Sequence, residues 1–417
     1  MVFLEFPILM TMCALWFYLP YLFFVRIMNP LPLTGLSSSS PDRLDNHEFT
    51  EIPIRVERDK ILVTVRVGNA DRTFLVDTGA PFMIDSTLAV EMGYSAIGSK
   101  GLNDAAGNST RVKTIRVPAF NLGEVSFTDR PALVYDFRNS LLGCFGIDGI
   151  IGSNLLQQHV VQFDWEAGKL LITDSARRLG LKPGESIRIR VNERQASPYV
   201  PVRLQDNIRI WSLLDTGSDE FFTICQTDLS SVREKGLLAS PPLSQSSGSA
   251  SLGLLGGQVD VRGWLIDAGM LRLDHVHIAD NVAIQSNLDN DSNIGMQLLQ
   301  RGNLTIDYPG ERIWFQPYAD IPGYRYEHFG LGFVPEDDHW IIREVWSGTD
   351  AERLGIAVGD TLLQYGRVNL SSEGICDILF QLPAERRGNR LEVVVRHVNP
   401  WREERYVLNR ISVGGAQ

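Results

Sequence analysis

Residues 74–80 read FLVDTGA and residues 213–218 read LLDTGS, so one short pattern occurs twice in the chain. In each copy an apolar run leads directly into Asp-Thr-Gly, at Asp77-Thr78-Gly79 and at Asp215-Thr216-Gly217. A lone copy would be weak evidence, because Asp and Gly are also common turn residues. The weight of the pattern therefore rests on what surrounds each copy.

Both copies are followed by the same landmarks. Residues 149–156 read GIIGSNLL and residues 293–299 read NIGMQLL. The shared glycine lies 152 − 77 = 75 residues after Asp77 and 295 − 215 = 80 residues after Asp215. Matched landmarks at similar spacing indicate an internal duplication. An approximate two-fold axis between two similar halves would bring Asp77 and Asp215 face to face.

Length and composition are those of a multidomain globular protein. The chain has 417 residues, of which 44% are hydrophobic and 21% charged, and it has room for two or three domains. Its net charge of −11 argues against a nucleic-acid partner. The four cysteines, which suggest neither a disulfide framework nor a zinc signature, are Cys13, Cys144, Cys225 and Cys376. We expect the last three to be small core residues.

The N-terminus differs from the rest of the chain. Residues 6–25 carry no charge and are long enough to span a bilayer, so residues 1–28 are predicted to be a membrane anchor. A cleaved signal peptide is the alternative, but Glu5 stands where a basic segment is expected and no small-residue cleavage site follows. The Pro- and Ser-rich residues 29–48 predict a flexible tether. Arg26 and Arg43 after the span favour a cytoplasmic body by the positive-inside rule.

Short alternating strands separated by turns predict two mostly β lobes, at residues 49–182 and 183–317. After residue 317 the pattern changes to strands mixed with short helices, which predicts a separate α+β domain at residues 322–411. Within this domain the tetrapeptide GLGF, at residues 330–333, is predicted to start a strand.

The paired DTG triplets and the strands that end in Gly152 and Gly295 resemble the pepsin and retropepsin clan of aspartic peptidases. The GLGF segment resembles a PDZ domain, and lobes of this kind joined to a PDZ domain resemble a group of bacterial membrane-associated or periplasmic peptidases. The resemblance implies a bilobal, pseudo-two-fold, mostly β fold followed by a PDZ domain. With the N-terminal transmembrane helix, it implies a single-pass membrane protein whose catalytic body is periplasmic or extracytoplasmic.

For activity, the resemblance implies an aspartic endopeptidase with Asp77 and Asp215 as catalytic residues. Two adjacent carboxyl groups cannot both ionise easily, so one keeps a proton as general acid while the other activates water as general base. Neither a metal nor a cofactor is expected. The partners would be protein or peptide substrates, and a chain that carries both halves is expected to be a monomer. A non-catalytic, peptide-binding scaffold with a PDZ interaction domain is the alternative.

The residues after each catalytic aspartate are predicted to support it. The hydroxyls of Thr78 and Thr216 can reach across to the opposite loop. Gly79 and Gly217 allow a backbone N–H to approach a carboxylate without a Cβ clash.

One difference between the copies predicts an unequal pair. Ser218 offers a hydroxyl to the Asp215 carboxylate, whereas Ala80 offers none to Asp77. A hydrogen bond to the charged form lowers a pKa, so we expect Asp215 to be ionised more often and Asp77 to hold the shared proton.

Glycine-rich segments between each aspartate and its shared glycine are candidates for flaps over the cleft. Residues 103–108 contain Gly107, and residues 253–257 contain Gly256 and Gly257. Such tips can open and close, although ordinary β-turns would have the same composition.

The GLGF segment could bind a C-terminal carboxylate on the backbone N–H groups of Leu331, Gly332 and Phe333, with the peptide added as a strand. Pro335 weakens this interpretation, because it lacks an N–H on the same edge. A docking or spacing role is the alternative.

His275 and His277 would lie on one face of a strand. Two histidines without a third ligand are more typical of a strand surface than of a zinc site, so no metal is expected.

Overall fold

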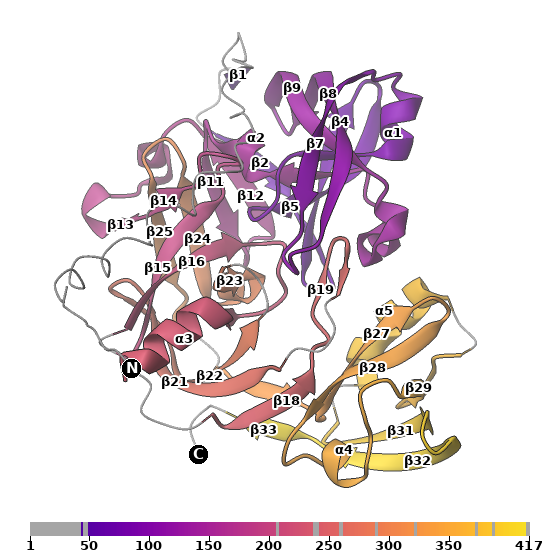
Figure 1. Cartoon of the computed structure of the whole chain (residues 1–417). Coiled ribbons are helices and arrows are strands. Elements are labelled where there is room, and N and C mark those ends of the chain that lie inside the picture. Colours follow the sequence, from indigo (N-terminus) through magenta and orange to yellow (C-terminus); the bar gives the residue numbers. More distant parts are fainter. Residues whose placement is uncertain are drawn as a thin grey trace, which may run out of the picture. The chain divides into compact units, whose positions relative to one another are not determined.

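The computed structural model describes residues 43–44, 49–205, 208–236, 242–257, 262–287, 291–320, 323–371, 374–385 and 388–413. The predicted membrane anchor, and the predicted tether apart from residues 43–44, lie outside these residues. Across the part of the chain that is described, no helix has the length and apolar character needed to cross a bilayer. The prediction of a mostly β protein is confirmed (Figure 1).

The first lobe is built on one mixed sheet. Along the sheet, hydrogen-bonded neighbours follow the order β1 (Arg43–Leu44), β9 (Val125–Tyr135), β6 (Met83–Asp85), β10 (Gly149–Gly152), β5 (Ala70–Asp77), β4 (Lys60–Val67), β8 (Ser109–Leu122) and β7 (Ala96–Asn103), with β3 (Arg55–Glu57) beside β4. The short strand β10 runs parallel to β5 and opposes Gly152 to Asp77. All four residues of β10 are buried, which explains why they are small or apolar.

The second lobe repeats this arrangement. Its strands are β14 (Arg190–Val191), β15 (Pro198–Leu204), β16 (Ile208–Asp215), β23 (Asn293–Gly295), β17 (Phe222–Cys225), β22 (Val276–Asn287), β21 (Trp264–Leu273) and β18 (Ser244–Gly248). Here β23 runs parallel to β16 and opposes Gly295 to Asp215. Each lobe also carries a short helix after its aspartate loop, α1 (Ser86–Glu91) and α3 (Gln226–Glu234).

A third sheet joins the two lobes and was not predicted. It has the order β13 (Ile187–Arg188), β25 (Arg312–Pro317), β24 (Gly302–Asp307), β11 (Val160–Asp164), β12 (Lys169–Thr173) and β2 (Thr50–Pro53). Its central pair is β11 from the first lobe and β24 from the second. One continuous cluster of buried apolar side chains runs through both lobes, so they share a core.

The C-terminal region has a hydrophobic core of its own, which includes Trp340, Ile342 and Val393. Its strands are β26 (Tyr326–His328), β27 (Leu331–Glu336), β28 (His339–Trp346), β29 (Thr361–Tyr365), β30 (Val368–Asn369), β31 (Arg390–His397), β32 (Arg402–Asn409) and β33 (Ile411–Val413). Two helices accompany them, α4 (Asp350–Arg353) and α5 (Ile375–Glu385).

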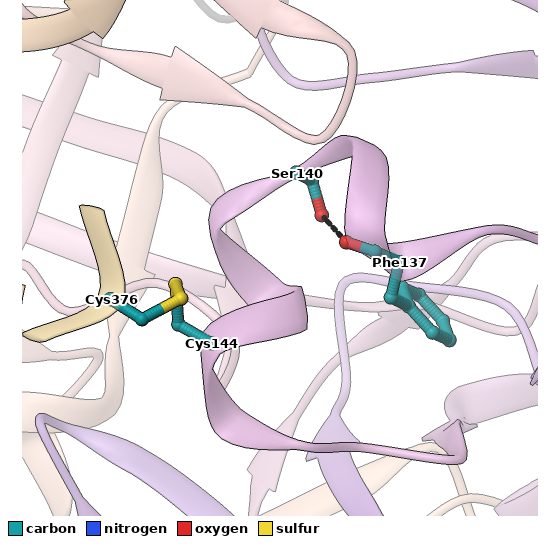
Figure 2. The surroundings of a disulfide bond; sticks show 4 residues. All are labelled: Phe137, Ser140, Cys144 and Cys376. Carbon is teal, nitrogen blue, oxygen red and sulfur yellow. Dashed lines mark hydrogen bonds between the residues drawn. A yellow bond between two sulfur atoms is a disulfide. The ribbon is translucent and has the colours of Figure 1, made fainter. Parts of the chain in front are cut away.

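This C-terminal domain is attached to both lobes. Strand β18 of the second lobe pairs with β28, so the two sheets are continuous (Figure 1). On the side of the first lobe, Cys144 and Cys376 form a disulfide across 232 residues of sequence (Figure 2). Phe145 and Phe380 pack edge to face beside it, with ring centroids 5.5 Å apart. The expectation that Cys144 and Cys376 are core thiols is therefore wrong, whereas Cys225 is a buried free cysteine.

A buried carboxyl group lies where β18 meets the C-terminal domain. Glu344 on β28 is paired in register with Gly248 and accepts a hydrogen bond of 3.2 Å from Gln285 Nε2. Hydrogen bonds from Trp346 and Ser246 also favour its charged form, but burial outweighs them and raises the pKa of Glu344 to about 7.

We expect Glu344→Gln to remove a pH dependence of stability. The ordinary pKa of the group is 4.5, so its contribution to stability is fully present below that pH and is lost as the pH rises through about 7. Above that pH, Glu344→Gln should be more stable than the parent by up to about 3 kcal/mol, with the difference vanishing in acid. Urea unfolding at a series of pH values measures this. The exposed Glu193→Gln is the control, and parallel curves for parent and Glu344→Gln would contradict the expectation.

Candidate active site

Asp77 and Asp215 lie side by side where the two lobes meet. Each ends a strand, β5 or β16, and each is held by the short parallel strand beside it. A Cβ added to Gly79 would lie 2.6 Å from Cγ of Asp215, and one added to Gly217 would lie 2.3 Å from Oδ2 of Asp77. The two carboxyl groups share a hydrogen bond. We refer to them as the aspartate pair.

The threonines cross between the lobes. The Thr78 hydroxyl donates to the Leu214 carbonyl at 2.6 Å and accepts from the Thr216 N–H at 3.0 Å. In reciprocal fashion, the Thr216 hydroxyl donates to the Val76 carbonyl at 3.0 Å and accepts from the Thr78 N–H at 3.1 Å. Both threonines are buried, so these four bonds fix the two loops against each other without competition from water.

The glycines let the backbone approach the carboxylates. The N–H of Gly79 donates to Asp77 Oδ1, and the N–H of Gly217 donates to Asp215 Oδ1, both at 2.8 Å. Because the opposite carboxyl group fills the space where a side chain would begin, only glycine fits at either position.

The pKa of Asp77 is raised well above its usual value. The largest cause is desolvation by the surrounding protein, followed by the negative charge of Asp215 and the hydrogen bond between the two carboxyl groups. The ammonium group of Lys60 and the Gly79 N–H act in the opposite direction but do not outweigh these effects. These effects favour the protonated form of Asp77.

Asp215 receives more hydrogen bonds than Asp77, but not from the group that the sequence suggested. Ser218 contacts Asp215 Oδ1 through its backbone N–H, at 3.2 Å, and not through its hydroxyl. The additional side-chain donor is Asn293, whose Nδ2 lies 2.9 Å from Asp215 Oδ2. Sequence reasoning missed this role, although a signal was present: Asn293 is polar at the position where β10 has Ile150.

Two further side chains reach the glycine carbonyls from the opposite lobe, and both were missed. Lys60 Nζ donates to the Gly217 carbonyl at 2.5 Å, and Gln195 Nε2 donates to the Gly79 carbonyl at 2.8 Å. Lys60 follows a hairpin turn with two left-handed residues, the second being Asp59 with φ of 58°. A local pattern could not have revealed these contacts, since each depends on how the lobes are joined.

A buried chain of hydroxyls supports the first loop from beneath. The Ser153 hydroxyl donates to the Thr78 carbonyl at 2.7 Å and lies 2.9 Å from the Tyr308 hydroxyl. Desolvation raises the pKa of Tyr308, so it remains a neutral hydrogen-bonding group. The second lobe has Met296 at the position of Ser153, which adds to the inequality of the two halves.

Both flap candidates are hairpin tips, and they touch. Gly107, with φ of 82°, lies in the turn between β7 and β8, and β19 (Leu252–Gly253) pairs with β20 (Gly256–Gly257). The buried carboxylate of Asp104 accepts from the Asn108 N–H at 2.7 Å and from the Leu255 N–H at 2.9 Å. It therefore ties the tip of the first lobe to the tip of the second.

The GLGF segment contributes Leu331, Gly332 and Phe333 to β27, which pairs with β28. A Cβ added to Gly332 would lie 2.6 Å from Cβ of Ala250 and 2.9 Å from Oε2 of Glu344. The segment thus packs against the link between β18 and β19 of the second lobe, with the carboxyl group of Glu344 close to it.

The two histidines of the strand pattern have separate partners at the surface. His275 Nδ1 lies 3.4 Å from Asp274, and His277 Nε2 lies 3.0 Å from Asp280.

Comparison with known proteins found a family model and a solved structure that each match part of the chain. No curated protein sequence matches the chain. Among solved structures, a retropepsin-like aspartic protease from Rickettsia conorii matches at 19% identity and a TM-score of 0.22, over 30% of this chain and 90% of that one. The family model described as aspartyl protease matches residues 63–155, which contain Asp77 and β10. In this region the chain is similar to aspartyl proteases, which supports a peptidase function.

Proposed function

We propose that the chain is a single-chain aspartic endopeptidase, with Asp77 and Asp215 as the catalytic dyad. The observation that carries the proposal is the contact between two carboxyl groups from different lobes, one of which has a raised pKa. A pair that shares one proton contains both a base and an acid, which peptide hydrolysis requires.

In this mechanism the ionised Asp215 removes a proton from water, and the water attacks the peptide carbonyl. The protonated Asp77 gives its proton to the carbonyl oxygen as the gem-diol intermediate forms. Asp215, which now holds the proton taken from water, gives that proton to the departing amine nitrogen. As the C–N bond breaks, Asp77 takes back a proton from a diol hydroxyl, which restores the pair. The hydrogen bonds of Thr78 and Thr216 keep the two carboxyl groups in register throughout, and preorganisation of this kind lowers the reorganisation needed in the transition state.

We propose that the two hairpin tips are flaps that open to admit substrate. This is supported by the contact between Asp104 and the Leu255 N–H, which closes one tip on the other. Opening would exchange these hydrogen bonds for bonds to water or to substrate backbone.

We propose that the C-terminal domain, which resembles a PDZ domain, docks protein partners or braces the flap of the second lobe. Bracing is supported by the pairing of β18 with β28 and by the contact of Gly332 with Ala250. Titration of the full chain with a peptide that has a free C-terminal carboxylate, and with its amide, separates the two roles. Preference for the free carboxylate supports capture by Leu331, Gly332 and Phe333, and equal weak binding supports bracing.

We propose that the catalytic body lies outside the cytoplasm, tethered by residues 1–28. The disulfide between Cys144 and Cys376 supports this side, because disulfides persist in oxidising compartments. A reporter fused after Gln417, active only on one side of the membrane, would test the orientation.

Activity is tested by incubating the full chain with a peptide library across an acid-to-neutral pH series and identifying the new termini. We expect internal cleavages that a pepstatin-like inhibitor suppresses and that the Asp215→Asn variant does not make. If the parent cleaves nothing at any pH but retains peptides, the non-catalytic scaffold is the correct function.

A further inference from the structure

We infer that Asn293 is a positioning residue that holds Asp215 as the ionised member of the aspartate pair and leaves the shared proton on Asp77. The inference rests on the proposed function for its catalytic meaning. Which of the two aspartates carries the negative charge can be measured even if the protein cleaves no peptide.

The first argument is the contact itself. Asn293 Nδ2 donates to Asp215 Oδ2 at 2.9 Å, while the N–H groups of Gly217 and Ser218 both donate to Oδ1. Both oxygens of Asp215 thus accept hydrogen bonds, as a carboxylate does and a protonated carboxyl group does less well. Asp77 has the Gly79 N–H on Oδ1 and no amide side chain in the corresponding place.

The second argument is the rigidity of the donor. Asn293 begins β23, which lies between β16 on one side and β17 on the other, in register with Leu213 and Thr223. Asn293 is 5% exposed, and its Oδ1 has no partner within the described part of the chain. Asp215 is therefore the hydrogen-bonding partner of this amide in the structure.

The third argument is the pseudo-symmetry. The residue that corresponds to Asn293 in the first lobe is Ile150, because each lies two residues before the glycine that opposes its aspartate. Ile150 is buried in an apolar cluster and can donate nothing to Asp77. The first lobe therefore shows, within the same protein, an aspartate without an amide donor beside it, with which Asp215 can be compared.

Other charges around the pair do not cancel this effect. Lys60 donates to the Gly217 carbonyl, whose peptide group presents the Ser218 N–H to Asp215, so its charge favours ionised Asp215. Lys60 also favours ionisation of Asp77, but less than the effects that raise the pKa of Asp77. Tyr308 faces Asp77 from the shared sheet and stays neutral. Asp219 follows in the same loop as Asp215 and is exposed.

The test compares Asn293→Ile, which copies the first lobe, with Asn293→Asp, which keeps the shape but replaces the donor by a second carboxylate. Ser218→Ala keeps the backbone N–H contact and serves as the matched control. Loss of a hydrogen bond to a charged group should raise the acidic limb of the kcat/KM profile by about one pH unit in Asn293→Ile. The rise should be larger in Asn293→Asp, where like charges oppose each other. A merely structural role would lower kcat at every pH without moving the limb.

The ionisation midpoints of Asp77 and Asp215 can also be measured without an activity assay, by NMR titration of the carboxyl carbons in the full chain. Signals are assigned by comparison with Asp77→Asn and Asp215→Asn. We expect Asp215 to ionise at lower pH than Asp77, and its midpoint to rise in both Asn293 variants. An unmoved midpoint in Asn293→Ile and Asn293→Asp, or a shift in Ser218→Ala alone, would overturn the inference. A shift in a chain that cleaves nothing would uphold the inference and reject the proposed function.

Discussion

Asp77→Asn and Asp215→Asn should each lose peptide cleavage, by about 10²- to 10⁴-fold or more in kcat/KM, while the protein stays folded. Each change removes one of the two proton-transfer groups and also the proton that the pair shares. Stability should behave differently from activity. Because the pKa of Asp77 is raised, its ionisation opposes folding as the pH rises, so Asp77→Asn should be at least as stable as the parent near neutral pH.

The measurement is steady-state kinetics on a peptide found in the library experiment, together with urea unfolding of the same samples. Asp219→Asn is the control, since Asp219 lies in the same loop but is exposed. Parent-like cleavage by either variant would remove that aspartate from the mechanism. A large loss of stability in Asp77→Asn would show that the pair is held in the charged form instead.

Thr78→Val should lower the free energy of unfolding by about 2–6 kcal/mol, and Thr216→Val by a similar amount. Valine keeps the shape of threonine but leaves two buried backbone groups of the opposite lobe without a partner, an N–H and a carbonyl. Each group left unpaired costs about 1–3 kcal/mol. Cleavage should fall as well, because the two loops lose their alignment.

The control is Thr78→Ser, which keeps the hydroxyl and loses only a methyl group, at about 1 kcal/mol. Urea midpoints of the two single variants and of Thr78→Val with Thr216→Val complete a double-mutant cycle. The double variant should cost less than the sum, because both hydroxyls belong to one network. Equal effects of valine and serine at position 78 would mean that packing, and not the hydrogen bonds, matters there.

The centre of the site could be predicted because it depends on short patterns that occur twice. An apolar strand that ends in Asp-Thr-Gly, and a second strand that ends in glycine, have the same local requirements in both lobes. The sequence therefore indicated Asp77 and Asp215 together with the threonines and glycines beside them. It also indicated an unequal pair, although the extra side-chain donor is Asn293 and not the hydroxyl of Ser218.

The strand pairings and side-chain contacts that join the two lobes and the C-terminal domain could not be predicted, because they form between segments that are distant in the sequence. The apolar strands β11 and β24 would suit many partners, and only the joined lobes pair them. Residues 244–248 read SQSSG, a composition typical of a loop, yet they form β18 because β21 and β28 supply hydrogen-bonding partners on its two sides. Lys60 and Gln195 act across the same junction.

The bond between Cys144 and Cys376 makes a closed covalent ring that contains the entire second lobe and the start of the C-terminal domain. A single backbone cut anywhere inside this ring leaves one molecule with an extra pair of ends. Such a nicked molecule would keep its full mass on a non-reducing gel and separate into two fragments only after reduction. A protein closed in this way can be cut within the ring without losing either aspartate.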